Sequence, residues 1–132
     1  MTVAALRDLI RTASRVYVIG NGGSYANADH IVNDLLAVGV CAFTIGPATL
    51  SAFANDHGWE HALARWIDVV GGPCDLLIAL SGSGTSPNIL NAVAMARSNG
   101  TMVWEEFGRA QGLDMQAAEE RQVWLGHQVT RS

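Results

Sequence analysis

The sequence predicts a three-layer α/β/α sandwich, in which helices cover both faces of a parallel sheet of about five strands. Short apolar runs alternate with helix-length segments along the chain, an alternation typical of βαβ units. The run DLLIAL at residues 75–80 is the most apolar, as expected of a central strand buried on both faces. Glycine-rich loops directly follow two of the runs. We expect one domain over residues 1–132, since this length supports a single core.

The first part of the chain starts with a helix and continues with a strand, a helix and a strand. Residues 2–14 carry apolar side chains at helical spacing, which predicts a helix. The short apolar run 15–20 predicts a strand, and the amphipathic segment 24–38 after the first glycine loop predicts a helix. Residues 40–45 are rich in β-branched and aromatic side chains, so we expect a second strand, which a Gly-Pro pair ends.

The remaining elements follow from the same patterns. A helical stretch from residue 48 leads to the turn ANDHG, and a helix over 59–70 ends at a Gly-Gly-Pro sequence. After the strand at 75–80, a helix over 87–98 ends at Asn-Gly. We expect two weaker strands at 101–106 and 122–126, separated by a polar turn and a short helix.

Composition excludes several function classes. The formal net charge is −4, whereas nucleic-acid binding needs clustered cations, so we expect no nucleic-acid partner. All eight basic residues are arginine, which excludes a Walker-loop lysine and a Schiff-base lysine. No apolar run predicts a membrane span, and the amphipathic N-terminus does not resemble a signal peptide, so we expect a cytoplasmic protein. Cys41 and Cys74 lie beside strand-like runs, and we expect buried free thiols.

The loop SGSGTS at residues 81–86 has the features of an anion site. Ser86 is well placed as a helix N-cap, with Pro87 at the first helical position. The glycines let backbone N–H groups turn inward, the hydroxyls add donors, and a helix N-terminus attracts anions without any lysine. A plain strand-to-helix turn would also use serine and glycine, but this loop has more serines than a turn needs. We therefore predict a phosphate site.

The first glycine loop, GNGGS, does not have the spacing of a dinucleotide site. In a G-x-G-x-x-G pattern that starts at Gly20, Tyr25 stands where the third glycine belongs. No acidic residue ends the second strand to hold a ribose, so we expect no nucleotide cofactor. Both glycine loops follow strands, and in open α/β sheets ligands bind at the carboxyl ends of strands. We therefore expect the two loops at the same edge of the sheet.

Two histidine patterns in the sequence are candidate metal sites. His30 and Asp34 are four residues apart and share one face of the 24–38 helix, although from the pattern alone a solvated polar face is the better explanation of this pair. HGWEH at 57–61 matches the zinc-peptidase pattern H-x-x-E-H, which belongs inside a helix, whereas Gly58 follows the first histidine here. A weak, adventitious metal at His57 and His61 is the other interpretation of that segment.

Taken together, GNGGS, the helix with a histidine and an acid one turn apart, NDHG-W-E and LIALSGSGTSPNILNAV resemble the sugar isomerase (SIS) domain family. Within that family the similarity is greatest to the phosphoheptose isomerases, and it runs from about residue 5 to residue 126. The resemblance implies a flavodoxin-like sheet and aldose–ketose isomerisation of a phosphorylated sugar such as sedoheptulose 7-phosphate. It also implies a homodimer or homotetramer with active sites shared between subunits.

The resemblance assigns a role to each matching position. His30 and Asp34 would serve zinc binding and proton transfer. The positions that would contact the substrate come from both glycine loops and from the ANDHG turn: Asn21, Gly22, Gly23, Ser24, Asn55, Asp56, Ser81, Gly82, Ser83 and Ser86.

The sequence departs from the family in two ways. Asp34 stands where the family has a glutamate, and the shorter side chain is expected to place its carboxylate about 1 Å short. The family's C-terminal helix, which carries a glutamine and a histidine, is expected to be absent, leaving His127 as the nearest substitute. This expectation opens two alternatives: a catalytically silent SIS domain that binds sugar phosphates or mediates assembly, and a fragment of a longer enzyme.

Overall fold

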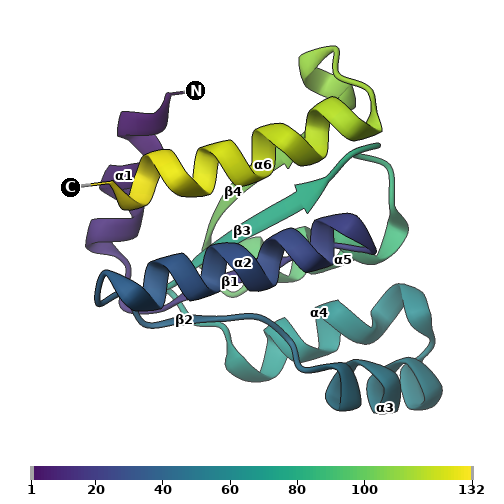
Figure 1. The fold of residues 1–132 in the computed structure, drawn as a ribbon. Helices are drawn as coiled ribbons and strands as arrows, with labels where there is room; N and C mark the ends of the chain where they lie inside the picture. Colours follow the sequence, from purple (N-terminus) through teal and green to yellow (C-terminus); the bar gives the residue numbers. More distant parts are fainter. Residues whose placement is uncertain (1, 132) are drawn as a thin grey trace.

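A parallel sheet of four strands forms the centre of the fold (Figure 1). The structure, a computed structural model, describes residues 2–131. The strand order is β2-β1-β3-β4, and every neighbouring pair is parallel. The strands are β1 (Val16–Ile19), β2 (Ala42–Phe43), β3 (Leu76–Ser81) and β4 (Met102–Phe107).

Helices cover both faces of this sheet, as predicted. One layer consists of α1 (Val3–Thr12), α2 (Gly23–Ala37) and α6 (Met115–Thr130). The other layer consists of α3 (Pro47–His57), α4 (Trp59–Val70) and α5 (Pro87–Ser98), with α3 packed on α4. A short 3₁₀ helix, η1 (Arg109–Gln111), connects β4 to α6.

Strand β3 divides the core into two halves. All of its residues are buried, which confirms the prediction for residues 75–80. Leu76, Ile78 and Leu80 pack with α1, α2 and α6, because alternate side chains of a strand point to opposite faces. Leu77 and Ala79 pack with α4 and α5 on the other face. The strand is therefore held from both sides, and the loop that follows it starts from a fixed point.

The predicted fifth strand at 122–126 is wrong, because these residues lie in the middle of α6. The buried positions of α6 recur at helical spacing: Ala118, Gln122, Leu125, Gly126 and Val129. The segment QVWLG is too short for a helical spacing of apolar residues to be distinguished from a strand pattern. The expectation that a C-terminal helix is absent is wrong for the same reason, since the chain ends in α6, which carries His127.

Two smaller expectations also need correction. The second strand is only Ala42–Phe43, shorter than the predicted 40–45. Cys41 and Cys74 are free, as expected, but both are exposed. Each of these cysteines precedes the buried part of its strand, at the amino edge of the sheet, where the covering helices no longer shield it.

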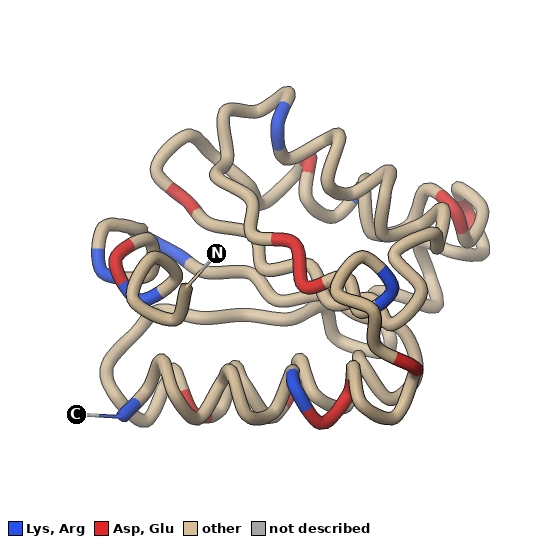
Figure 2. Tube along the Cα trace, turned by 90° about the horizontal axis from the view of Figure 1, so that it is seen from above, with Lys and Arg blue, Asp and Glu red and all other residues tan. Residues whose placement is uncertain are grey.

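The surface carries both charge signs and a number of large apolar side chains. Figure 2 shows acidic and basic residues interspersed over the helices and loops around the sheet. Among residues 2–131, no helix combines the length and the apolar character that a bilayer span requires. Several bulky apolar side chains are exposed, including Trp59, Met115 and Trp124.

Helix α6 packs closely against α2 at a glycine. Gly126 is buried, and a Cβ built on it would lie 2.7 Å from Cγ1 of Ile31 on α2. Ile31 is itself in the core and has little room to move. The absence of a side chain at position 126 therefore sets the approach of the two helices.

Replacing Gly126 with alanine is expected to destabilise the protein. Alanine raises helix propensity by about 1 kcal/mol, but overpacking a filled core costs about 1–3 kcal/mol, so a net loss is expected. Urea unfolding of G126A measures the change. Gln116→Ala, at an exposed position near the start of α6, is the matched control and should change stability by no more than about 0.5 kcal/mol. A midpoint for G126A above that of the wild type would contradict this packing account.

A second contact holds the sheet to the layer formed by α3, α4 and α5. The hydroxyl of Tyr17 on β1 donates to the backbone oxygen of Val70 at 2.6 Å and to Oδ2 of the buried Asp75 at 3.0 Å. Burial, and then the hydrogen bond to the Asp75 carboxylate, raises the pKa of Tyr17 to about 12. The neutral phenol is the form that this environment stabilises.

The raised pKa of Tyr17 predicts a loss of stability in alkali. Its contribution is fully present below pH 10.0, the pKa of an ordinary tyrosine, and is lost as pH rises towards about 12. Tyr17→Phe should cost about 1–3 kcal/mol at neutral pH, because Asp75 loses its donor, and should show a smaller further loss in alkali. Urea unfolding at several pH values measures both effects. Equal alkaline losses in the two proteins would show that Tyr17 does not cause the dependence.

Candidate functional site

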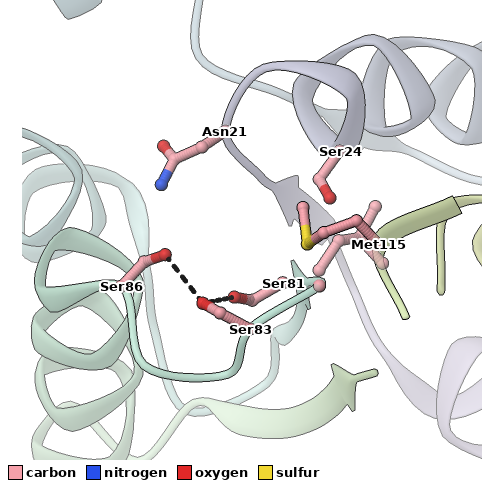
Figure 3. A pocket seen from close by; sticks show the side chains of 8 residues that line it. Asn21, Ser24, Ser81, Ser83, Ser86 and Met115 are labelled. Atoms are coloured by element: carbon pink, nitrogen blue, oxygen red, sulfur yellow. Dashed lines mark hydrogen bonds between the residues drawn. The ribbon is translucent and has the colours of Figure 1, made fainter. Parts of the chain in front are cut away.

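A small pocket lies where strands β1 and β3 end. The chain adds β2 on one side of β1 and then crosses to β3 on the other, so this is the topological switch point of the sheet. The pocket volume of about 50 Å³ gives room for a few waters or one phosphate-sized group. Eight residues from both glycine loops, β3 and α6 line it: Asn21, Ser24, Leu80, Ser81, Gly82, Ser83, Ser86 and Met115 (Figure 3).

The serine loop turns its hydroxyl groups towards one another. Oγ of Ser81 accepts a hydrogen bond from the Gly84 N–H at 2.9 Å, and Oγ of Ser83 accepts one from the Thr85 N–H at 3.2 Å. The Ser83 hydroxyl also lies 3.4 Å from that of Ser86 (Figure 3). The loop therefore forms a compact group of hydroxyl and N–H donors that contains no charged side chain.

Ser86 and Pro87 stand at the N-cap and first-turn positions of α5, as predicted. The Ser86 hydroxyl, however, makes no capping hydrogen bond, and it lines the pocket instead. In the first turn of α5, Pro87 has no N–H and the N–H groups of Ile89 and Leu90 donate to the backbone oxygen of Ser86. Of this turn, the Asn88 N–H is therefore the backbone donor left for an anion beside the pocket.

Asn21 is held by a residue that the sequence interpretation missed. The side-chain amides of Asn21 and Asn88 exchange two hydrogen bonds, of 2.9 and 2.8 Å. Asn88 is buried in the first turn of α5, so this pair fixes the first glycine loop to the helix that follows the second. The pattern SGSGTSPN contains Asn88, but nothing in the spacing indicates a partner 67 residues away.

Of the other residues of the first loop, Ser24 lines the pocket, whereas Gly22 and Gly23 do not. Gly22 is the N-cap of α2 and has a φ of 54°, a conformation that favours glycine. Gly23 starts the helix, and the Ser24 hydroxyl accepts a hydrogen bond from the buried Gln122 at 3.1 Å. Ser24 thus connects the pocket to α6.

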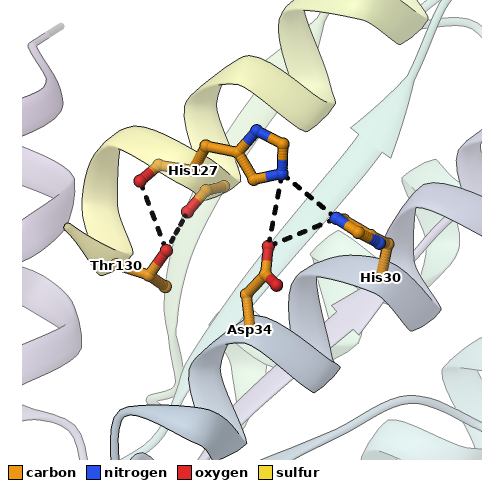
Figure 4. Close-up of polar contacts among 5 residues, drawn as sticks. His30, Asp34, His127 and Thr130 are labelled. Carbon is orange, nitrogen blue, oxygen red and sulfur yellow. Dashed lines mark hydrogen bonds and ion pairs between the residues drawn. The ribbon is translucent and has the colours of Figure 1, made fainter.

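A second polar cluster lies further along the contact between α2 and α6. Nε2 of His30 is 3.4 Å from Oδ2 of Asp34, and Nε2 of His127 is 3.7 Å from the same oxygen (Figure 4). The two histidine Nε2 atoms are 3.1 Å apart. Among residues 2–131, these three are the side chains whose ligand atoms come close enough to hold one metal ion.

The cluster has the composition and the open side of a catalytic metal site. Oδ2 of Asp34 is buried and has no hydrogen-bond partner, so an acceptor points into the cluster unsatisfied. Two imidazoles and a carboxylate are a common ligand set for zinc, with a fourth position left for water or substrate. The histidine side chains are about half exposed, at 48% and 46%, so a ligand can reach this position.

The cluster corrects three expectations. Asp34 does reach both histidines, although its side chain is one methylene shorter than glutamate. His127 is part of the cluster, whereas its spacing in the sequence gave no reason to select it. The helix face that carries His30 and Asp34 is not simply solvated, because it faces His127 on α6, although His30 itself stays about half exposed.

The ANDHG turn lies apart from both groups. Asn55 and Asp56 are exposed in the last turn of α3, bonded to each other at 3.2 Å, and do not line the pocket. His57 ends α3, and Gly58, with a φ of 87°, separates it from α4. The HGWEH segment is therefore not within one helix, and the metal-ligand cluster of the described residues does not include its two histidines.

Relatives of the chain are found by sequence. No family model matches it. It is 36% identical over 119 residues to a phosphoheptose isomerase from Bradyrhizobium sp., which covers 84% of this chain and 60% of that protein. It is 36% identical over 118 residues to a phosphoheptose isomerase from Paramagnetospirillum magneticum, with coverage of 83% and 62%. The chain thus spans about three fifths of the length of these relatives.

Solved structures show the same fold. The phosphoheptose isomerase from Neisseria gonorrhoeae superposes with a TM-score of 0.85 and 23% identity, covering 97% of this chain and 80% of that one. The one from Francisella tularensis gives a TM-score of 0.87 and 23% identity, covering 97% and 82%. In sequence and in fold, therefore, the chain is a relative of the phosphoheptose isomerases, and the resemblance indicated by its two glycine-rich loops is confirmed.

Proposed function

We propose that the chain acts as an aldose–ketose isomerase of a phosphorylated sugar, resembling sedoheptulose 7-phosphate isomerase. One observation carries this proposal: the serine pocket and the His30, Asp34 and His127 cluster lie along the same contact between α2 and α6. His30 is six positions after Ser24, a rise of about 9 Å along the helix. An extended sugar phosphate can therefore bind its phosphate at one end and place its carbonyl at the other.

The loop at residues 81–86 is the proposed phosphate site. Its hydroxyl groups and the free Asn88 N–H at the start of α5 are neutral donors beside a phosphate-sized space. Because no lysine or arginine lines the pocket, the phosphate is held by geometry and the helix dipole.

His30, Asp34 and His127 are the proposed ligands of a zinc ion. When bound there, the metal would supply a Lewis acid that polarises the substrate carbonyl oxygen. The residues themselves have a second role. Isomerisation moves a proton between neighbouring carbons, and a carboxylate that holds the metal through one oxygen keeps the other free, so Asp34 would accept and return this proton.

We also propose that the site is completed in an oligomer, a homodimer or homotetramer. Helix α3 has no buried residue, although apolar side chains such as Phe53 are among its eleven residues. An uncovered helix of this kind is typical of a surface that packs on another subunit. Asn55 and Asp56, at the end of α3, would then contact sugar hydroxyls in the neighbouring subunit's site.

A reducing compartment, the cytoplasm, is the proposed location. Both cysteines are exposed and free, and exposed free thiols are typical of proteins kept under reducing conditions.

Turnover of sedoheptulose 7-phosphate tests the activity. Asp34→Asn should lower turnover by at least about 10²-fold, since general acid–base groups contribute about that much, while the affinity for inorganic phosphate stays unchanged. Ser83→Ala should weaken phosphate binding itself. Ser98→Ala, at the exposed end of α5, is the control and should match the wild type.

Two results would count against this reading. Full turnover in D34N would remove Asp34 from the mechanism. Binding of the sugar phosphate by the wild type without turnover, with and without added zinc, would favour a catalytically silent binding domain.

Zinc binding tests the metal assignment directly. Titration against a chromophoric chelator should show one zinc ion per chain, and His127→Ala should weaken its affinity at least about tenfold, because one of three ligands is lost. His57→Ala is the matched control, since His57 lies outside the cluster. Equal affinities in the two variants would place the metal elsewhere.

A further inference from the structure

A larger pocket lies on the face of the sheet that α4 covers, opposite the face on which α2 and α6 pack. It has a volume of about 250 Å³ and is bounded by β1, the edge strand β2 and α4. The residues that line it are Arg15, Tyr17, Phe43, Thr44, Trp66 and Val70. None of them lines the serine pocket or belongs to the cluster of His30, Asp34 and His127. This pocket is therefore separate from the proposed active site.

Aromatic rings form much of its wall. The Phe43 ring stacks on the buried ring of Tyr17, with ring centres 5.9 Å apart, and the Trp66 ring meets Tyr17 edge to face at 5.6 Å. Phe43 is 42% exposed, although it belongs to a strand of the sheet, so its ring keeps an uncovered surface. Aromatic rings pair with one another in both the stacked and the edge-to-face arrangement. The pocket therefore offers flat apolar surfaces to one further planar ring.

The charged residue of the pocket is Arg15, directly before β1. Among residues 2–131, the ion pairs and the cation–π contact of arginine involve other arginines, so no carboxylate or ring engages Arg15. Its charge nevertheless lies close to the ring of Tyr17: burial is the main cause of the raised pKa of Tyr17, and the Arg15 charge acts in the opposite direction. The guanidinium therefore brings unused hydrogen-bond donors to the pocket.

Thr44 is a second polar residue of the pocket without a partner. Its Oγ1 is buried and makes no hydrogen bond within the described part of the chain, which is uncommon in native folds. The Tyr17 hydroxyl, by contrast, donates to Val70 and to Asp75, and Asp75 does not line the pocket. The pocket thus combines apolar walls, one free cation and no carboxylate.

This combination selects one class of ligand. Aromatic cages without a cation bind ammonium groups, but the positive charge of Arg15 disfavours a cation here and favours an anion. A guanidinium matches a carboxylate through two parallel hydrogen bonds. We infer that the pocket binds a small aromatic carboxylate, with its ring against Phe43 and Trp66 and its carboxylate on Arg15. The inference does not rest on the proposed function, because the two sites share no residue.

NMR titration of isotope-labelled protein with benzoate tests the inference. Benzoate should shift the indole N–H signal of Trp66 and the amide signal of Thr44 until both saturate; Trp66→Phe assigns the indole signal. Benzyl alcohol has the ring without the charge, and acetate has the charge without the ring. Each should bind at least about tenfold more weakly than benzoate, because it lacks one of the two contacts.

Two variants and a control locate the contacts. Arg15→Gln should weaken benzoate binding about tenfold, because hydrogen bonds between charged groups are lost. Phe43→Ala, on the edge strand, should weaken it about threefold through the lost ring contact. Arg11→Gln is the matched control, since Arg11 is exposed in the last turn of α1 and lies outside the pocket, and it should bind benzoate like the wild type.

Three results would overturn the inference. Equal benzoate affinities of R15Q and R11Q would show that Arg15 does not hold the carboxylate. Equal affinities for benzyl alcohol and benzoate would show an apolar pocket that does not recognise an anion. Benzoate that shifts neither the Trp66 nor the Thr44 signal would show that the pocket does not bind it. Each of these results leaves the proposed function intact, since that function is measured by turnover of the sugar phosphate.

Discussion

The close contact between α2 and α6 is the constraint on which the candidate site depends. Gly126 lets α6 approach Ile31, and the next residue, His127, then meets His30 and Asp34. Gly23 allows a second close approach, by Glu119. Two glycines, one on each helix, thus replace side chains that would separate the helices. Neither the cluster nor the wall of the serine pocket would exist at a normal helix–helix distance, because α6 supplies a residue to each.

A buried carboxylate, that of Glu106 on β4, pairs with Arg121 and so connects α6 to the sheet. Glu106, at the end of β4, is 3% exposed and accepts hydrogen bonds from the Trp104 indole and the Gln111 amide, both at 3.0 Å. Arg121 of α6 lies 3.4 Å from the same carboxylate and 5.4 Å from the ring centre of Trp124. A buried charge of this kind contributes little net stability, but removing one of its partners would leave an uncompensated buried charge. Its role here is to connect β4, η1 and α6 in one geometry.

The parts that the sequence predicts well are those whose signals are local. The strand at 75–80 and the helix at 87–98 each carry their pattern within a few residues, and both are confirmed. His127 and Asn88 could not be selected in this way, because their partners lie 97 and 67 residues away and meet them only through helix packing. The error at 122–126 has a related cause: five residues are too few to separate a helical period from a strand period.

The arrangement of charge explains how such a site can select its ligand. The proposed phosphate pocket is lined by neutral donors and no basic side chain, while Asp34 and Glu119, along the contact between α2 and α6, are both carboxylates. A pocket without cations gains little from long-range attraction, so an anion must fit the donors to replace its lost hydration. The carboxylates add a cost for any ligand that brings negative charge without hydrogen-bond donors. A ligand with a phosphate at one end and hydroxyl groups along the rest of its carbon chain meets both conditions: its anion fits the neutral donors, and its hydroxyl groups donate to the carboxylates. The absence of a basic residue from the pocket is therefore a source of selectivity.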